Sequence, residues 1–210
     1  LRQKDRDTDE IYISYSTPKT QNRTYLYNIK TKEKKLVKEQ IIPSGHEPND
    51  YIVERLECPS HDGRVVPITI TRHKNTPIDG SAELLLYGYG SYGHSMSPTF
   101  SSTRLSLIKR NIIWATAHIR GGMERGMKWW KEGKLLNKKN TFKDYIACAK
   151  FLIEKKYTSK KKIIGMGGSA GGLLMGVVVN EEPDLFLGVI MAVPFVDSLT
   201  TNLDHSLPLT

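Results

Sequence analysis

The segment Gly167-Gly168-Ser169-Ala170-Gly171-Gly172 constrains the fold of this sequence most, because four glycines surround a single serine. Before it comes the apolar run 162–166, typical of a buried strand, and after it comes 172–180, typical of a helix. Small residues are needed where strand and helix backbones nearly touch, and such a tight turn lifts the serine above the sheet edge. The pattern predicts a G-x-S-x-G turn with Ser169 as the nucleophile. The alternative is an ordinary serine in a glycine-rich turn, which the strand–turn–helix context disfavours.

A nucleophilic serine also needs donors for the oxyanion that forms on its substrate. The backbone amide of Ala170, at the start of the following helix, is one predicted donor. The second should come from the turn after an earlier strand, where the sequence has Tyr87-Gly88-Tyr89-Gly90-Ser91-Tyr92. A tyrosine hydroxyl can replace a backbone amide there. On the residues alone, packing is the favoured explanation for these tyrosines.

The catalytic base is not evident in this sequence. In this fold the acid and the histidine follow the serine along the chain. His205 comes only 36 positions after Ser169 (205 − 169), and the carboxylates in that interval are Asp184, Asp197 and Asp204. Further strands should separate a nucleophile from its base, so we interpret His205 as a surface residue.

The remaining sequence predicts two regions that differ in their pattern of secondary structure. Period-two runs at 10–16, 24–29 and 35–38 indicate a short antiparallel meander, too small to bury its faces alone, in a first domain 1–48. The second domain, 49–210, opens with a strand pair at 51–57 and 65–72 and then alternates strands with helices, which predicts an α/β fold with a mostly parallel sheet. Its later strands are expected at 82–87, 111–117, 162–166 and 187–193, and its helices at 99–109, 140–155 and 172–180.

Composition excludes several other functions. The lysines behind the formal charge of +9 fall mainly in runs at 30–38 and 155–162, where Tyr157 is the single aromatic residue, so there is no interleaved aromatic pattern for stacking on bases and nucleic acid is not an expected partner. No apolar run is long enough for a membrane helix, and no apolar signal region follows Leu1. Cys58 and Cys148 lie far apart, which favours a reducing, cytoplasmic compartment. Leu1 is not methionine, so the sequence is expected to begin inside a longer chain.

No metal or cofactor is expected. The histidines that precede Ser169 show no metal-ligand spacing; they are His46, His61, His73, His94 and His118. Arg120 ends a predicted central strand at the same sheet edge as Ser169. It is a candidate for substrate binding or for bracing a loop, and bracing is favoured.

With these residues in place, the sequence resembles the prolyl oligopeptidase family of serine peptidases, and within it the oligopeptidase B group. The resemblance rests on an ordered set of stretches across most of residues 50–210. They are 87–93 (YGYGSYG), 117–122 (AHIRGG), 133–142 (GKLLNKKNTF), 167–172 (GGSAGG), 193–197 (VPFVD) and 206–210 (SLPLT). Ala170 matches the oligopeptidase B group, whereas the proline-specific members carry asparagine there.

The resemblance implies an α/β-hydrolase domain capped by a seven-bladed β-propeller, with cleavage of short peptides after Arg or Lys. Residues 1 to about 45 then resemble the last propeller blade. By position, Ser169 matches the nucleophile, Ala170 and Tyr89 the oxyanion donors, and Tyr92 a residue of the substrate pocket. Short basic peptides are the expected partners.

The departures from the family pattern are as informative as the matches to it. The triad Asp and His and the acidic residues that hold the basic side chain have no match before Thr210, and Met123 replaces an expected glycine. The hydrolase fold is therefore expected to be incomplete and the isolated fragment inactive. The alternatives are a non-catalytic remnant or a complementing half that pairs with a separate C-terminal half. An esterase of the same fold is disfavoured, because the sequence lacks an HGGG loop.

Overall fold

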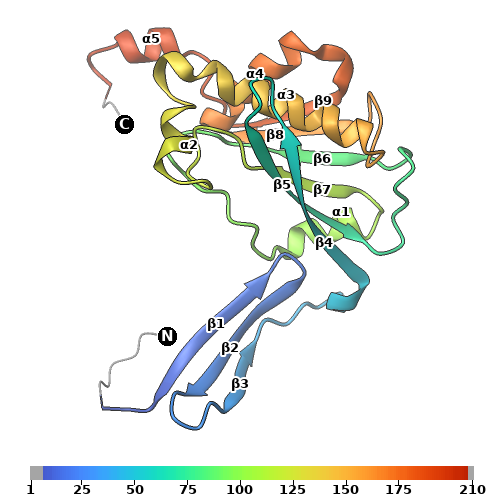
Figure 1. Ribbon diagram of the computed structural model, residues 1–210, viewed down its shortest axis with the longest axis vertical. Helices are drawn as coiled ribbons and strands as arrows, with labels where there is room; N and C mark the ends of the chain where they lie inside the picture. Colours follow the sequence, from blue (N-terminus) through green and yellow to red (C-terminus); the bar gives the residue numbers. More distant parts are fainter. Residues whose placement is uncertain (1–6, 208–210) are drawn as a thin grey trace.

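The computed structural model describes residues 7–207, which contain two separate β-sheets (Figure 1). The first is an antiparallel meander in the order β1-β2-β3, with β1 (Glu10–Thr17), β2 (Thr20–Asn28) and β3 (Lys34–Glu39). The predicted strands of this meander are confirmed, with ends displaced by a few residues. Parts of two predicted segments lie outside the described residues, namely 1–6 of the first domain and 208–210 of the stretch 206–210.

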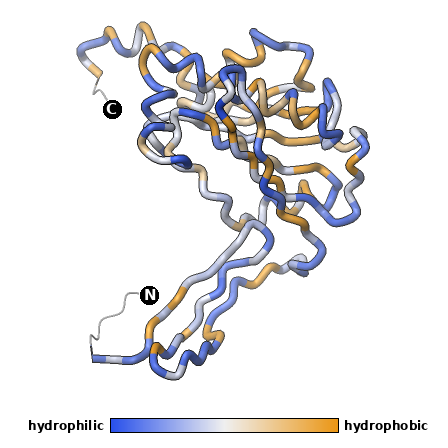
Figure 2. Tube along the Cα trace, viewed as in Figure 1, coloured by the Kyte–Doolittle hydropathy of each residue, from blue (hydrophilic) through white to orange (hydrophobic). Residues whose placement is uncertain are grey.

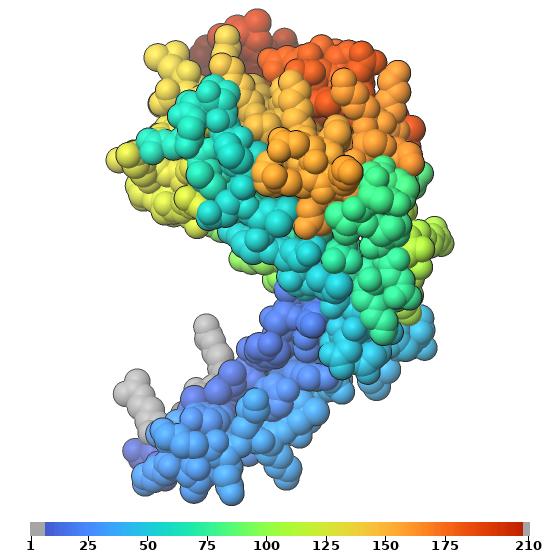
Figure 3. All heavy atoms as spheres, turned by 45° about the vertical axis from the view of Figure 1, so that its right-hand side comes forward, coloured from blue at the N-terminus to red at the C-terminus, as the bar shows by residue number. Residues whose placement is uncertain are grey.

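The meander stands away from the rest of the molecule, and Figure 3 shows a narrow connection between the two parts. Many of its apolar side chains are exposed; they include Tyr12, Ile13, Tyr15, Leu36 and Val37. The link between the sheets runs through the short 3-10 helix η1 (Pro48–Asp50). A three-stranded sheet with both faces accessible cannot bury enough apolar surface to be stable alone, as its sequence suggested.

The second sheet has six strands in the order β4-β5-β7-β6-β8-β9 within the described residues. Strands β7, β6, β8 and β9 are parallel, whereas the β4–β5 hairpin runs antiparallel at one edge, so the sheet is mixed. The bounds are β4 (Tyr51–Pro59), β5 (Val65–His73), β6 (Leu84–Tyr87), β7 (Ile113–Ala117), β8 (Ile163–Gly168) and β9 (Phe186–Ala192).

Helices cover the two faces of this sheet unequally. Within residues 7–207, helices α3 (Lys139–Glu154) and α4 (Ala170–Glu181) pack on one face, and the short α1 (Ser102–Ile108) packs on the other (Figure 1). Shorter helices are α2 (Met127–Lys131), η2 (Leu135–Asn137), η3 (Pro183–Leu185) and α5 (Ser198–Leu203). None of the helices in residues 7–207 is both long and apolar enough to span a bilayer.

The main core lies between the sheet and the α3–α4 layer, where the parallel strands are the most apolar part of the trace (Figure 2). Strands buried on both faces read as continuous apolar runs, which explains the sequence of β6 and β7. A smaller cluster on the opposite face joins Leu85 and Trp114 to Leu105 and Ile108 of α1.

The structure corrects several predicted boundaries. Helix α4 begins at Ala170, two residues before the predicted 172, because the turn at Ser169 leads directly into the first helical residue. Helix α1 begins at Ser102, and β6 begins at Leu84. The sequence did not predict α2 and α5, because helices of five or six residues are too short to show a helical period.

Candidate active site

Ser169 lies on a strained turn between β8 and α4, with φ 54° and ψ −118°. Few residues with a Cβ adopt positive φ outside the compact left-handed helical region, and the cost is about 1–3 kcal/mol. Three backbone hydrogen bonds hold the turn: the Ser169 amide donates to Ala192 O (2.9 Å), and the amides of Gly172 (2.8 Å) and Phe195 (3.0 Å) donate to Ser169 O. The serine itself is exposed.

The glycines around Ser169 are required by close contacts between backbones. A Cβ added to Gly167 would lie 2.2 Å from the carbonyl oxygen of Gly171, and one added to Gly172 would lie 2.5 Å from Cα of Pro194. At Gly168 the nearest atom would be 3.4 Å away, which is an ordinary contact. The predicted reason for small residues therefore holds at two of these positions and fails at Gly168.

The glycine-rich loop after β6 lies beside this turn. Since β6 and β8 are parallel neighbours, their carboxyl ends meet at one edge of the sheet. A Cβ on Gly171 would lie 2.9 Å from Gly88 O and 3.3 Å from Cδ2 of Tyr89, so the start of α4 touches this loop. The structure thus brings Tyr89 and Ser169 together from positions 80 residues apart (169 − 89).

Tyr89 has the electrostatic properties of a neutral donor. Burial raises the pKa of its phenol, Tyr92 and Tyr87 add to the rise, and a hydrogen bond with the Ser169 side chain acts in the opposite direction. A raised pKa keeps the hydroxyl protonated at neutral pH. The amide of Ala170 is the first in α4, and such amides have no acceptor within their own helix. Both groups can therefore donate to a developing oxyanion.

Tyr92 lies farther along the same loop and differs from Tyr89 in its surroundings. Its side chain is 65% exposed, and its backbone is left-handed with φ 57°. Gly90 and Gly93 also have positive φ, both at 67°, so the loop needs its glycines for conformation. The Tyr92 ring is thus exposed, and it lies near enough to Tyr89 to influence the pKa of that phenol.

Arg120 is buried beneath the loops and forms two ion pairs. Its guanidinium donates to both carboxylate oxygens of Asp144 (2.8 and 2.6 Å) and to both of Asp62 (2.6 and 3.2 Å). Burial alone would lower the pKa of Arg120, but these hydrogen bonds outweigh burial and raise it. Since only 1% of the residue is exposed, this geometry favours bracing over contact with substrate.

Two members of this network, Asp144 and Ser60, were not singled out in the sequence. Asp144 is fully buried on α3, where it also accepts from the Ser60 hydroxyl (2.6 Å) and the Arg120 amide (3.1 Å). A signal existed, because Asp144 shares the helical face of the buried residues Thr141, Tyr145 and Cys148. A carboxylate on an apolar face needs a cationic partner.

The residues considered for completing a triad are engaged elsewhere or exposed. Asp184 pairs with Lys161, Asp197 caps α5 through the Thr200 amide, and Asp204 accepts from Ser206. His205 is exposed in the turn after α5. In the part of the chain that the structure describes, no hydrogen bond or ion pair connects His205 with Ser169. Nor does any group of three metal-ligating side chains occur within residues 7–207.

An exposed serine on a glycine turn, at the carboxyl edge of parallel strands, is the way in which serine hydrolases of the α/β class present a nucleophile. Comparison with known proteins agrees with that class. The model of the prolyl oligopeptidase family matches residues 98–210. The chain belongs to the prolyl oligopeptidase family.

Individual relatives span far more sequence than this chain. Dipeptidyl aminopeptidase BI of Pseudoxanthomonas mexicana is 45% identical over 204 residues, covering 97% of the chain and 28% of that protein. Protease 2 of Moraxella lacunata is 42% identical over 210 residues, covering 100% and 30%. Oligopeptidase B from Trypanosoma brucei, solved with covalently bound antipain, superposes with a TM-score of 0.90 at 40% identity and covers 97% and 29%. The chain thus spans less than a third of these relatives.

Proposed function

We infer that this chain carries the nucleophile of a serine peptidase that cleaves short peptides after Arg or Lys. The observation that carries this inference is the exposed Ser169 on its strained turn, beside the Ala170 amide and the Tyr89 hydroxyl. The membership in the prolyl oligopeptidase family supports the peptidase class. The preference for basic residues rests on the likeness to oligopeptidase B and protease 2, and on Ala170 after the serine.

In the proposed reaction, the Ser169 hydroxyl attacks the carbonyl carbon of the scissile peptide bond. Its proton passes to a histidine base, and the carbonyl oxygen becomes an oxyanion that accepts from Ala170 N–H and Tyr89 O–H. Collapse of this intermediate breaks the C–N bond, the amine leaves with the proton, and the acyl group stays on Ser169. Water then takes the place of the amine and attacks the acyl carbon, giving a proton to the histidine. The bond between the acyl carbon and the Ser169 oxygen breaks, the acid leaves, and Ser169 takes the proton back.

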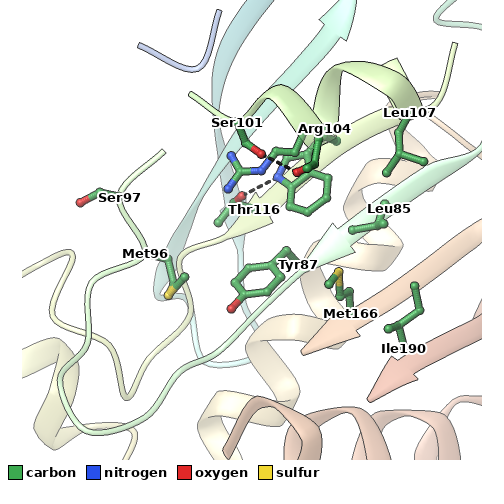
Figure 4. A pocket seen from close by; sticks show the side chains of 12 residues that line it. Leu85, Tyr87, Met96, Ser97, Ser101, Arg104, Leu107, Thr116, Met166 and Ile190 are labelled. Carbon is green, nitrogen blue, oxygen red and sulfur yellow. Dashed lines mark hydrogen bonds between the residues drawn. The ribbon is translucent and has the colours of Figure 1, made fainter. Parts of the chain in front are cut away.

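The histidine and its carboxylate are proposed to come from polypeptide that joins this chain, either in the same molecule or as a separate C-terminal half. An open groove on the α1 face of the sheet supports this proposal. It has a volume of about 460 Å³, and its apolar lining includes Leu85, Tyr87, Trp114, Met166 and Ile190 (Figure 4). A mostly parallel sheet is normally covered on both faces, so we propose that the polypeptide supplying the histidine packs in this groove.

The groove also carries a charge that favours an acidic partner. Arg104 lines it with its guanidinium over the Trp114 ring, 4.6 Å from the ring centroid. Burial lowers the pKa of Arg104, and the one opposing influence comes from Tyr87 rather than from a carboxylate. We propose that the covering segment is amphipathic and places a carboxylate against Arg104.

The meander β1–β3 is proposed to be the last blade of a β-propeller.

The first test compares the isolated chain with its Ser169→Ala variant on dipeptide amides that end in Arg or Lys. We expect equal, background rates, because loss of the histidine costs several orders of magnitude. Turnover by the isolated chain that disappears in Ser169→Ala would show that the histidine and carboxylate are already present within it.

The second test mixes the chain with a separately expressed C-terminal half that carries the triad Asp and His. Restored cleavage, lost in Ser169→Ala and retained when the exposed Ser106 of α1 is replaced by Ala, would support a split peptidase. An Ile190→Asp variant should weaken the restoration by placing a charge in the groove. Aggregation without cleavage would support a non-catalytic remnant, and cleavage of esters but not of amides would support an esterase.

A further inference from the structure

Lys138 occupies an unusual position for a lysine. It lies at the N-cap of α3, before Lys139, where helices favour Ser, Thr, Asp or Asn and where the positive end of the helix dipole opposes a cation. The residue is half-buried, and no ion pair to it is found within residues 7–207. Neither helix stability nor charge pairing therefore accounts for this ammonium group.

The side chain of Lys138 contacts the glycine-rich loop and its own helix. Its Nζ donates to Gly90 O at 2.6 Å and to Ser91 Oγ at 2.8 Å, and it lies 5.9 Å from the centroid of the Phe142 ring. Hydrogen bonds from an ammonium group are stronger than those between neutral groups. The two acceptors sit between Tyr89 and Tyr92 in the sequence.

This stretch of the loop is also held by the burial of Gly90 and Ser91 and by a backbone hydrogen bond from the His94 amide to Ser91 O (3.0 Å). Its ends are held by backbone bonds, from the Gly88 amide to Met166 O (3.0 Å) and from the Gly93 amide to Gly121 O (2.9 Å). In the middle, Gly90 is left-handed and packs so closely that an added Cβ would lie 2.4 Å from Cγ2 of Thr141. Glycine adopts this conformation without strain but also adopts others, so the packing around Gly90 and the hydrogen bonds from Lys138 are what select it.

We propose that Lys138 is a positioning residue that clamps the loop and thereby sets the places of Tyr89 and Tyr92. Tyr89 precedes the clamped carbonyl by one residue, and Tyr92 follows the clamped hydroxyl by one residue. Loss of the clamp would free the donor that faces Ser169 and the ring at the rim of the site. The role of Tyr89 as an oxyanion donor rests on the proposed function. The contact between Lys138 and the loop does not.

The protonation state of Lys138 provides a second, pH-dependent way to test the clamp. Burial lowers the pKa of its ammonium group to about 8, from an ordinary value of 10.5, and burial is the sole cause of this shift. The groups that face it are the Gly90 carbonyl and the Ser91 hydroxyl of the loop and the Phe142 ring of α3, none of them charged near neutral pH. Above pH 8 the clamp therefore loses its positive charge.

Two effects of pH on this group have opposite signs. The unfolded chain holds the proton up to pH 10.5 and the folded chain only to about 8, so the contribution of Lys138 to global stability rises between those values. The hydrogen bonds to the loop weaken over the same interval as the charge is lost. A lysine with a merely structural role would not make global stability rise while the hydrogen bonds to the loop weaken.

The test is amide hydrogen exchange on the whole 210-residue chain, with Lys138→Met, Lys138→Arg and the neighbouring, exposed Lys139→Met as the matched control. In Lys138→Met we expect the amides of Gly93 and His94 to exchange about tenfold faster or more, whereas β6 is unchanged. The arginine variant should restore most of the protection, and the Lys139 variant should behave as wild type. Unchanged loop exchange in Lys138→Met, or an equal rise in β6, would overturn the clamp.

The pH arm keeps the proposal testable if Lys138→Met does not fold. After correction for intrinsic exchange, protection of the Gly93 amide in the wild-type chain should fall between pH 7.5 and 9 while the stability of the core does not. Parallel changes in loop and core would also overturn the proposal. A confirmed clamp in a complemented chain without peptidase activity would refute the proposed function alone.

Discussion

Replacing Gly167 by alanine tests whether backbone contact, rather than flexibility, explains the glycines of the turn. The new Cβ would meet the Gly171 carbonyl oxygen at 2.2 Å and its carbon at 2.6 Å. Both are backbone atoms at the start of α4, which cannot rotate away as a side chain could. Either β8 or α4 must therefore move.

The expected cost is about 2–3 kcal/mol. Overpacking costs about 1–3 kcal/mol, and a backbone obstacle belongs at the upper end of that range. The loss of a glycine also makes the unfolded chain less flexible, which returns about 0.4–1 kcal/mol. For a chain of this length, each kcal/mol lowers the melting temperature by about 2–4 °C, so Gly167→Ala should melt about 5–10 °C below wild type.

Gly168→Ala is the matched control one position away. Its Cβ would have nearest neighbours at 3.4 and 3.6 Å, so we expect a melting temperature within about 2 °C of wild type. Thermal denaturation followed by circular dichroism compares the three proteins. If Gly167→Ala had the same melting temperature as Gly168→Ala, the tight approach of strand and helix would be refuted. The reason given for the exposed serine would then fail as well.

The ion pairs of Arg120 yield two further predictions. In urea denaturation, Asp144→Ala should cost about 3–5 kcal/mol because it leaves a buried charge unpaired, whereas Asp62→Ala, whose side chain is 35% exposed, should cost about 1 kcal/mol. Equal losses would contradict the ranking by burial. Burial alone would raise the pKa of Asp62, but hydrogen bonds from Arg120 and from the Arg64 amide outweigh it and lower the pKa. The stabilisation by Asp62 should therefore be complete above about pH 4 and be lost on further acidification, so melting temperatures measured down to pH 2.5 should fall more steeply for wild type than for Asp62→Asn. Parallel curves would refute this linkage.

The alternation of strand and helix patterns in the sequence was sufficient to predict the α/β sheet and the serine turn. Strand β7, within segment 111–117, is apolar because it is buried along its whole length, whereas β8, which overlaps segment 162–166, alternates buried and half-buried residues. The run around Ser169 predicted the turn because few backbones other than one with several glycines can reverse so abruptly. Local chemistry alone fixes such features, so they need no knowledge of distant residues.

Short helices left too little pattern to be predicted, and α5 and α2 were missed for that reason. The role of Arg120 also could not be chosen from sequence. Its two carboxylate partners come from the β4–β5 turn and from α3, 58 and 24 positions away, and only the packing of those elements shows that the guanidinium is enclosed.

The sequence by itself determined that Ser169 sits on a tight turn, that tyrosines follow an earlier strand and that both belong to an α/β sheet. Only the tertiary structure decided that Tyr89 lies against Ser169, that Lys138 contacts the loop that follows Tyr89, and that one face of the sheet carries an open groove. The physical reason is that turns depend on neighbours along the chain, whereas a site depends on which strands lie side by side. Parallel pairing of β6 with β8 is a long-range choice that no local pattern encodes.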